Sequence, residues 1–306
     1  MYIVMSHPTI TSSTTFRKAL LWYLNNKAGI SQSDYVDEDG TVLTSLSQPN
    51  NWNMSSVTTL YWMFGNHDGS NLTSHASTFN EDISSWDVSN VTTMYRIFRS
   101  CSSFNQNINS WDVSNVTSME EAFSGCTVYN QPLSTWATGN VVSMKSMFNT
   151  CRAFNQPLDA VGDAWDVSKV QNMGGMFQHT RSSGSWVLTT HPTFNESLSN
   201  WNLGSAADIQ RMFYGTNWNH PSITTWTGGS KVFAASSMFH LNVVFNQPLP
   251  WGDATSNAPF TLNTGQSGIM FISMFENARG YNQPINMIAG IHNTNVTYVR
   301  MDKMFK

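Results

Sequence analysis

Residues 104–123 read FNQNINSWDVSNVTSMEEAF and residues 79–98 read FNEDISSWDVSNVTTMYRIF, so one unit of about 25 residues occurs twice in succession. The phenylalanine that ends the unit recurs along the chain at Phe64, Phe98, Phe123, Phe148, Phe177, Phe213, Phe239, Phe275 and Phe305. A period between roughly 20 and 50 residues indicates that each unit cannot bury its apolar face alone and stacks on its neighbours. The sequence therefore predicts one solenoid domain over residues 50–306, with about nine coils.

The composition of the chain argues against some classes of binding partner. Charged residues form 11% of the 306-residue chain, against about 25% in typical domains. The net charge of -4 and the scattered Lys and Arg argue against nucleic acid or an anionic membrane as the main partner, because either requires a basic stripe. No stretch reaches the roughly 18 apolar residues of a membrane-spanning helix, so membrane insertion is not expected.

Each unit has the pattern of a strand followed by a tight helical segment. Residues 91–94 are rich in β-branched side chains, whereas residues 95–98 place apolar side chains three to four positions apart. We therefore predict an α/β fold in which every coil has one short strand and one short helix or 3₁₀ turn.

Tryptophan occupies one fixed place in the unit, twelve residues before the terminal phenylalanine, at Trp52, Trp86, Trp111, Trp136, Trp165 and Trp201. A large apolar side chain at the same place in every coil is typical of a core, although exposed indoles in a row could also stack on sugars. The pattern favours a buried column.

The polar residues of the unit repeat as regularly as the tryptophans do. An asparagine follows the aromatic residue that opens each unit, and these asparagines are Asn80, Asn105, Asn130, Asn155, Asn195, Asn219, Asn246 and Asn282. Side-chain amides at equivalent places predict a hydrogen-bonded ladder. Asp87, Asp112 and Asp166 precede serine and are interpreted as caps of turns.

The three cysteines also share one place in the unit. Cys101, Cys126 and Cys151 each lie three residues before an aromatic–asparagine pair. An odd number cannot pair completely, so buried free thiols are expected in preference to a disulfide. A metal site would need a CxxC motif or a nearby histidine, and neither accompanies these cysteines.

The segments FNQNINSWDVSNVTSMEEAF and FNQPLDAVGDAWDVSKVQNMGGMF resemble the bacterial surface-protein repeat of mycoplasma-type lipoproteins and BspA-like leucine-rich-repeat proteins. The resemblance covers about residues 50–306. It implies a leucine-rich-repeat-like solenoid, exposure at a surface, and adhesion or interaction with a host, with no catalytic residues attached to the motif. The export and lipidation signals of the lipoprotein members are not found in the N-terminal stretch of this sequence.

Residues 1–49 lie outside the repeat and are predicted to form an N-terminal cap. A helix is expected over residues 12–28, with Thr14 or Thr15 as its N-cap and Gly29 as its stop. Such a cap covers core side chains and backbone groups that an open first coil would expose. At the other end, Met301, Met304 and Phe305 are predicted to dock on a protein partner or on another copy of the chain.

Three insertions lengthen the repeat, at residues 65–78, 178–193 and 252–268. The first two are candidate recognition loops, because long polar and aromatic loops on a regular scaffold often bind partners. Their candidate binding residues are His67, Asp68, His75, Arg181, Trp186 and His191. A metal site made from the first three matches no common ligand spacing.

Known catalytic and cofactor-binding motifs are not found in the sequence, so neither an enzyme nor a cofactor is predicted. Two non-enzymatic functions fit. The first is a structural or assembly component of a virion or other surface particle, which would need no recognisable signal peptide. The second is an adhesin or receptor-recognition protein that binds a host glycan or protein through its insertion loops. A remote alternative is a polysaccharide-cleaving solenoid with Asp87 and Asp112 as its carboxylates.

Overall fold

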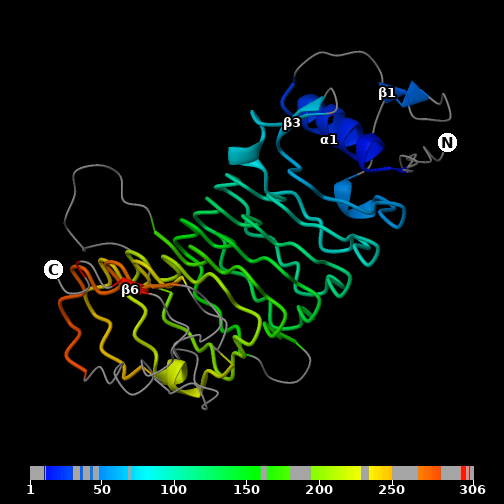
Figure 1. Cartoon of the computed structure of the whole chain (residues 1–306). Coiled ribbons are helices and arrows are strands. Elements are labelled where there is room, and N and C mark those ends of the chain that lie inside the picture. Colours follow the sequence, from blue (N-terminus) through cyan, green and yellow to red (C-terminus); the bar gives the residue numbers. More distant parts are fainter. Residues whose placement is uncertain are drawn as a thin grey trace.

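The computed structural model places the repeat units as successive coils in one elongated stack, with helix α1 (Ser13–Lys27) at the N-terminal end (Figure 1). It describes residues 10, 12–29, 35–36, 42–43, 48–67, 70–159, 164–179, 194–228, 234–249, 268–283, 298–300 and 303. The predicted candidate residues Asp68, Arg181, Trp186, His191, Met301, Met304 and Phe305 lie outside the described residues.

Coils are joined by a ladder of backbone hydrogen bonds in which most amides donate to the next coil, while others, such as that of Thr117, donate to the preceding coil. The amides of Met94 and Arg96 donate to the carbonyl oxygens of Ser118 and Glu120 in the next coil, both at 2.9 Å. The amide of Ile97 lies between the donors Arg96 and Phe98. It donates instead to the carbonyl oxygen of Met94 in its own coil, at 3.2 Å. Amides that reach the next coil therefore alternate with amides that close tight turns.

Parallel pairing between coils is one residue wide over most of the stack. The residues that pair in succession are Thr59, Thr93, Ser118, Ser143, Asn172, Asp208 and Ala234. The expected short strand is thus reduced to a single bridge, and tight turns stand where a helix or 3₁₀ turn was expected. The likeness to leucine-rich-repeat proteins stays a prediction.

A left-handed residue in each coil explains this lack of regular structure. The residue two positions before the terminal phenylalanine has a φ between 47° and 64°, at Trp62, Arg96, Glu121, Ser146, Gly175, Arg211, Ser237, Ser273 and Lys303. Such a conformation interrupts both strand and helix, and it costs a residue with a Cβ about 1–2 kcal/mol. The coil-to-coil ladder offsets that cost by giving the alternate amides partners.

The remaining elements are short. Strand β1 (Tyr35–Val36) pairs antiparallel with β2 (Val42–Leu43), β3 (Asn66–His67) pairs antiparallel with β4 (Ser70–Asn71), and β5 (Gly268–Met270) pairs parallel with β6 (Tyr298–Arg300). The described 3₁₀ helices are η1 (Pro49–Asn51), η2 (Ala76–Thr78) and η3 (Pro221–Thr225).

Aromatic columns fill the core along the stack. The ring centroids of Phe98 and Phe123 lie 5.5 Å apart, as do those of Phe123 and Phe148. The ring that opens the next unit packs against each terminal phenylalanine, as Phe104 does against Phe98 at 4.1 Å. Because every coil adds rings to the same columns, the apolar face of one unit is covered only by its neighbours.

The tryptophans form the predicted buried column. Trp86, Trp111 and Trp136 are at most 3% exposed. The indole nitrogen of Trp111 donates to the carbonyl oxygen of Ile83 at 3.1 Å, and that of Trp136 donates to Ile108 at 3.1 Å. Each indole is therefore fixed both by burial and by a hydrogen bond to the preceding coil.

The asparagine ladder is confirmed. The backbone amide of Asn130 donates to the side-chain oxygen Oδ1 of Asn105 at 2.9 Å, and the backbone amide of Asn155 donates to Oδ1 of Asn130 at 2.9 Å. The same bond joins the remaining pairs, from Asn80–Asn105 to Asn246–Asn282. A neutral amide can repeat in this way because each group accepts from one neighbour without charge repulsion.

Aspartate and cysteine also take their predicted places. Oδ1 of Asp112 accepts from the backbone amide of Ser114 at 3.0 Å, and the hydrogen bonds that the Ser114 side chain and backbone donate lower the pKa of Asp112. Cys101, Cys126 and Cys151 are free and buried. Burial raises the pKa of all three thiols, so they pack as small apolar groups.

Helix α1 covers the open side of the first coil. Its N-cap is Ser12, whose Oγ accepts from the amide of Thr15 at 3.2 Å, so the expected cap at Thr14 or Thr15 was placed too late. Gly29 follows the helix with a φ of 73°, as its role as a stop requires. Phe16 contacts the first indoles edge-on, with centroids 6.4 Å from Trp52 and 5.2 Å from Trp86.

Arg17 is the one charged residue of α1 that is buried, at 3% exposure. Its guanidinium donates to the carbonyl oxygens of Trp62, Met63 and Gly65, at 2.7 Å to Trp62 and 2.8 Å to Gly65. The carbonyls equivalent to those of Met63 and Gly65 accept in later coils from the preceding coil. The arginine therefore supplies donors where a preceding coil would.

Candidate functional site

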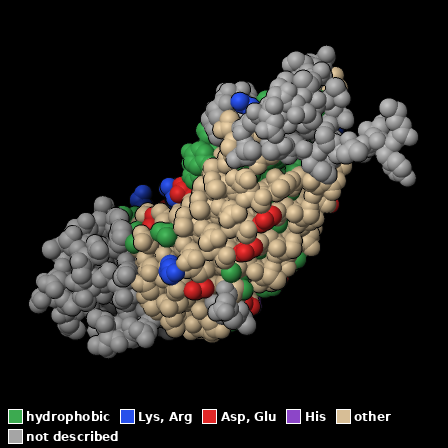
Figure 2. Space-filling view, turned by 90° about the vertical axis from the view of Figure 1, so that its right-hand side faces the viewer, with side chains coloured by type: hydrophobic (Ala, Val, Ile, Leu, Met, Phe, Trp, Pro, Cys, Tyr) green, Lys and Arg blue, Asp and Glu red, His purple; other side chains and the backbone are tan. Residues whose placement is uncertain are grey.

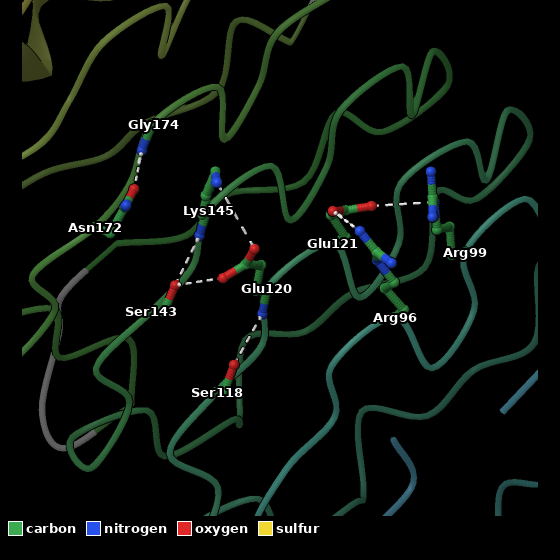
Figure 3. A network of polar contacts seen from close by, with 9 residues as sticks. All are labelled: Arg96, Arg99, Ser118, Glu120, Glu121, Ser143, Lys145, Asn172 and Gly174. Carbon is green, nitrogen blue, oxygen red and sulfur yellow. Dashed lines mark hydrogen bonds and ion pairs between the residues drawn. The ribbon is translucent and has the colours of Figure 1, made fainter. Parts of the chain in front are cut away.

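One face of the stack carries side chains that change from coil to coil. We call it the charged face and define it by Tyr95, Arg96, Arg99, Glu120, Glu121 and Lys145. These residues lie within the three positions before the terminal phenylalanine or directly after it. Figure 3 shows five of the six in two groups from successive coils, one of Glu121 with Arg96 and Arg99 and one of Glu120 with Lys145.

Glu121 is the centre of the first ion-pair cluster. Its Oε1 lies 2.7 Å from Nη2 of Arg96, and its Oε2 lies 3.0 Å from Nε of Arg99. The hydrogen bond that Arg96 donates to Glu121 raises the pKa of Arg96. The side chain of Arg99 is 41% exposed while that of Glu121 is 16% exposed, so the carboxylate is held inside and an arginine faces solvent.

The second cluster is looser. Nζ of Lys145 lies 3.9 Å from Oε1 of Glu120, and Oγ of Ser143 donates to Oε2 of the same carboxylate at 3.4 Å. Half of the Lys145 side chain is exposed. Exposed pairs of this kind add little stability, typically below about 1 kcal/mol, so they fix side-chain positions more than they hold the coils together.

Aromatic side chains extend this face toward α1. The rings of Tyr61 and Tyr95 stack with centroids 4.8 Å apart and an angle of 14° between them. Cζ of Arg96 lies 4.7 Å from the Tyr95 ring centroid and 5.7 Å from that of Trp62. Burial raises the pKa of Tyr95. Stacked rings beside an arginine give a flat apolar surface with positive charge at its rim.

The other polar surfaces are occupied by contacts within the stack. The amide groups of the asparagine ladder bond to the neighbouring coil, and Asp87 and Asp112 bond to the serines of their own turns. Figure 2 shows a side made mainly of uncharged polar groups and backbone, with acidic side chains spaced across it. The charged face differs from the asparagine ladder and the aspartate turns because its side chains are not repeated from coil to coil.

His75 is the predicted site residue whose side chain the structure describes. Its Nε2 lies 2.9 Å from Oδ1 of Asn25 in α1, and burial lowers its pKa. The first insertion thus lies against the helical cap. His67 is in β3, but its side chain is outside the described residues. Among the described residues, no group of three or more metal-binding side chains comes together.

The charged face was not singled out from sequence. The sequence signal for this face is a position of the repeat that varies. The tryptophan and asparagine positions hold the same residue in most units, whereas the position three residues before the terminal phenylalanine holds Tyr95, Glu120 and Lys145 in successive units. A residue that changes from unit to unit within a conserved pattern is a candidate for binding, because packing does not dictate it.

The chain belongs to the family described as "Mycoplasma protein of unknown function, DUF285", whose model matches residues 42–114, 67–187 and 183–306. This confirms the predicted resemblance to the mycoplasma-type repeat. Comparisons with curated proteins and with solved structures gave no significant match. Within the part of the chain that the structure describes, no helix is long and apolar enough to cross a membrane.

Proposed function

We propose that the protein is a non-enzymatic, leucine-rich-repeat-like scaffold displayed at a surface, where its charged face binds a partner protein. The family match supports a repeat protein of the mycoplasma type. A binding role without catalysis agrees with the state of Asp87 and Asp112, whose carboxylates cap the turns that contain them.

This proposal rests on a difference between two surfaces of the stack in how their polar side chains are bonded. The asparagine ladder and the aspartate turns satisfy their hydrogen bonds inside the stack. On the charged face, Arg99 and Lys145 extend into solvent with 41% and 50% of their side chains exposed. Arginine and tyrosine are enriched at the anchors of protein interfaces, and the rim of an interface is polar.

A structural role in a virion or other surface particle is the second candidate. It is favoured by the continuous ladder, which gives the same contact between coils from Thr59 to Ala234. A stack held in this way acts as a stiff rod, which suits a spacer or a building block. In that case the charged face would contact another component of the particle.

A photo-crosslinking experiment distinguishes these functions. A benzoylphenylalanine is placed at position 99, on the charged face, or at position 169, where the exposed Lys169 lies on an aspartate turn. Both variants are irradiated in intact cells or particles of the source. Recognition predicts an adduct with one foreign protein from position 99 and none from position 169.

Assembly predicts adducts from position 99 with another component of the particle, and this outcome would replace the first proposal by the second. Equal adducts from both positions, or none from position 99, would contradict a binding role of the charged face. Antibodies against the purified chain should label intact cells or particles, because both functions require exposure at a surface.

A further inference from the structure

Two exposed cations lie on either side of a coil that has glycines at the equivalent places. Lys145 is three residues before the terminal phenylalanine of the fourth coil, and Arg211 is two residues before that of the sixth. In the fifth coil these two places hold Gly174 and Gly175. No side chain projects from them, and we call the surface formed by these four residues the glycine saddle.

Polar groups around the two glycines explain why no side chain is present. Oδ1 of Asn172 accepts from the backbone amide of Gly174 at 2.9 Å (Figure 3). A Cβ at position 174 would lie 3.2 Å from that oxygen and 3.3 Å from Oδ1 of Asp208. Gly175 has a φ of 64°, a conformation that glycine adopts without strain. The backbone of the fifth coil therefore lies bare of side chains between the two cations.

Arg211 repeats the backbone geometry of Arg96 without its ionic partner. Both residues lie at the left-handed place of their coils, with φ of 55° and 56°. Arg96 pairs at 2.7 Å with Glu121, which holds the same place in the next coil. After Arg211 that place holds Ser237, and no ion pair joins Arg211 to a carboxylate of the described residues. The pair of Arg96 and Glu121 shows which group fits at Arg211, namely a carboxylate.

The cations of the saddle are more exposed than the carboxylates near it. Half of the Lys145 side chain is exposed, against 26% for Glu120. Arg211 is exposed, whereas Asp208 is half-buried and its Oδ1 accepts from the backbone amide of Gln210 at 2.8 Å. A partner that approaches from solvent therefore meets the two cations before it meets a carboxylate.

We infer that the glycine saddle binds an acidic segment of the partner protein, with one carboxylate on Lys145 and another on Arg211. Two coils advance the stack by about 10 Å, and residues three apart in a polyproline II segment lie about 9 Å apart on one side. The glycines allow the backbone of such a segment to lie close to the fifth coil. This inference rests on the proposed function, because it names the chemistry of the partner.

The test titrates the full chain, with nitrogen-15 in its arginine side chains, with the peptide EPPEPPE. Its three glutamates match Arg99, Lys145 and Arg211, which follow one another at every second coil. Nuclear magnetic resonance follows the Nε–Hε signals, and Arg211→Gln assigns the signal of Arg211. We expect this signal to shift saturably with EPPEPPE and to stay unchanged with QPPQPPQ, which has no carboxylates.

A second peptide tests the spacing of the carboxylates. EEEPPPP has the same composition and charge as EPPEPPE, but its adjacent glutamates cannot reach both cations of the saddle. It should bind about fivefold more weakly, because one ion pair is lost.

Matched protein variants locate the binding. Lys145→Gln should weaken the binding of EPPEPPE about fivefold. Lys169→Gln is the control, because Lys169 is also exposed but lies on an aspartate turn, where its Nζ bonds to Oδ1 of Asn140 at 2.9 Å. Both side chains extend into solvent, so both variants should fold as the unchanged chain does.

Three results would overturn the inference. They are no saturable shift of the Arg211 signal, equal affinities of EPPEPPE and EEEPPPP, or equal losses for Lys145→Gln and Lys169→Gln. The proposed function is judged separately by the crosslinks from position 99. Crosslinks without peptide binding would contradict only the acidic segment, and peptide binding without crosslinks would contradict only the function in cells.

Discussion

The guanidinium of Arg17 donates to the carbonyl oxygen of Gly65 at 2.8 Å. In the third coil the equivalent oxygen, that of Ser124, accepts from the amide of Ser100 in the coil before it at 2.7 Å. One side chain of α1 thus takes over hydrogen bonds that a preceding coil would provide. The helical cap therefore does more than cover apolar surface, because it also satisfies the open edge of the ladder.

Arg17→Met tests this capping role. The substitution keeps much of the apolar stem but leaves buried carbonyl oxygens without donors, at a cost of about 1–3 kcal/mol for each. We expect the free energy of unfolding to fall by about 3 kcal/mol and hydrogen exchange to speed up in residues 57–65. The neighbouring Lys18 is exposed, so Lys18→Met should change stability by less than about 0.5 kcal/mol. Similar effects of the two substitutions would contradict the role of Arg17.

Tyr129→Phe should leave stability unchanged or raise it by about 1 kcal/mol. Tyr129 takes the place that phenylalanine holds in neighbouring units, and its buried hydroxyl has no hydrogen-bond partner. Removing that hydroxyl removes a desolvation penalty. The reverse change, Phe104→Tyr, should lower stability by about 1–3 kcal/mol. Urea unfolding measures both, and a loss of stability in Tyr129→Phe would show that the hydroxyl is bonded.

The asparagine ladder predicts losses of different size for two substitutions at one position. Oδ1 of Asn130 accepts from the amide of Asn155, so Asn130→Ala should cost about 1 kcal/mol. Asn130→Asp keeps an acceptor oxygen at that position and should retain most of the stability above pH 5. If both variants lost the same amount of stability by thermal unfolding, the ladder would not depend on the acceptor.

The cysteines should be inert in the folded chain. Burial raises the pKa of Cys101 and Cys126, and the thiolate is the form that reacts. At pH 8, iodoacetamide should leave the native protein unlabelled for as long as it stays folded, and it should modify all three thiols in denaturant. Mass spectrometry counts the labels. Rapid labelling of the native chain would contradict the burial of this column.

The predictions from sequence succeeded where one residue type recurs at one place. Asn130 and Trp111 could be placed because repetition itself shows that neighbours in space are equivalents in sequence. The left-handed backbone at Arg96 could not be predicted, since arginine carries none of the preference for positive φ that glycine would show. Without that feature, the turns were expected to be strand and helix.

Arg17 shows a signal that was present in the sequence but was not used. It lies directly after Phe16 and three residues before Leu20, on the buried side of the helix. A charged residue among apolar helix positions usually has buried polar partners. Its partners at Met63 and Gly65 could not be named from sequence, because the ends of the ladder become apparent only once the coils are stacked.

The central claim is that successive units stack in register, so that equivalent residues contact each other. The rings of Phe104 and Tyr129, which open consecutive units, have centroids 5.7 Å apart and planes within 1°. Selective labelling of tyrosine and phenylalanine rings should therefore give nuclear Overhauser cross-peaks between Tyr129 and both Phe104 and Phe154. Cross-peaks at both neighbours are the result predicted here, whereas a Tyr129 ring without contact to either would contradict the stacked arrangement.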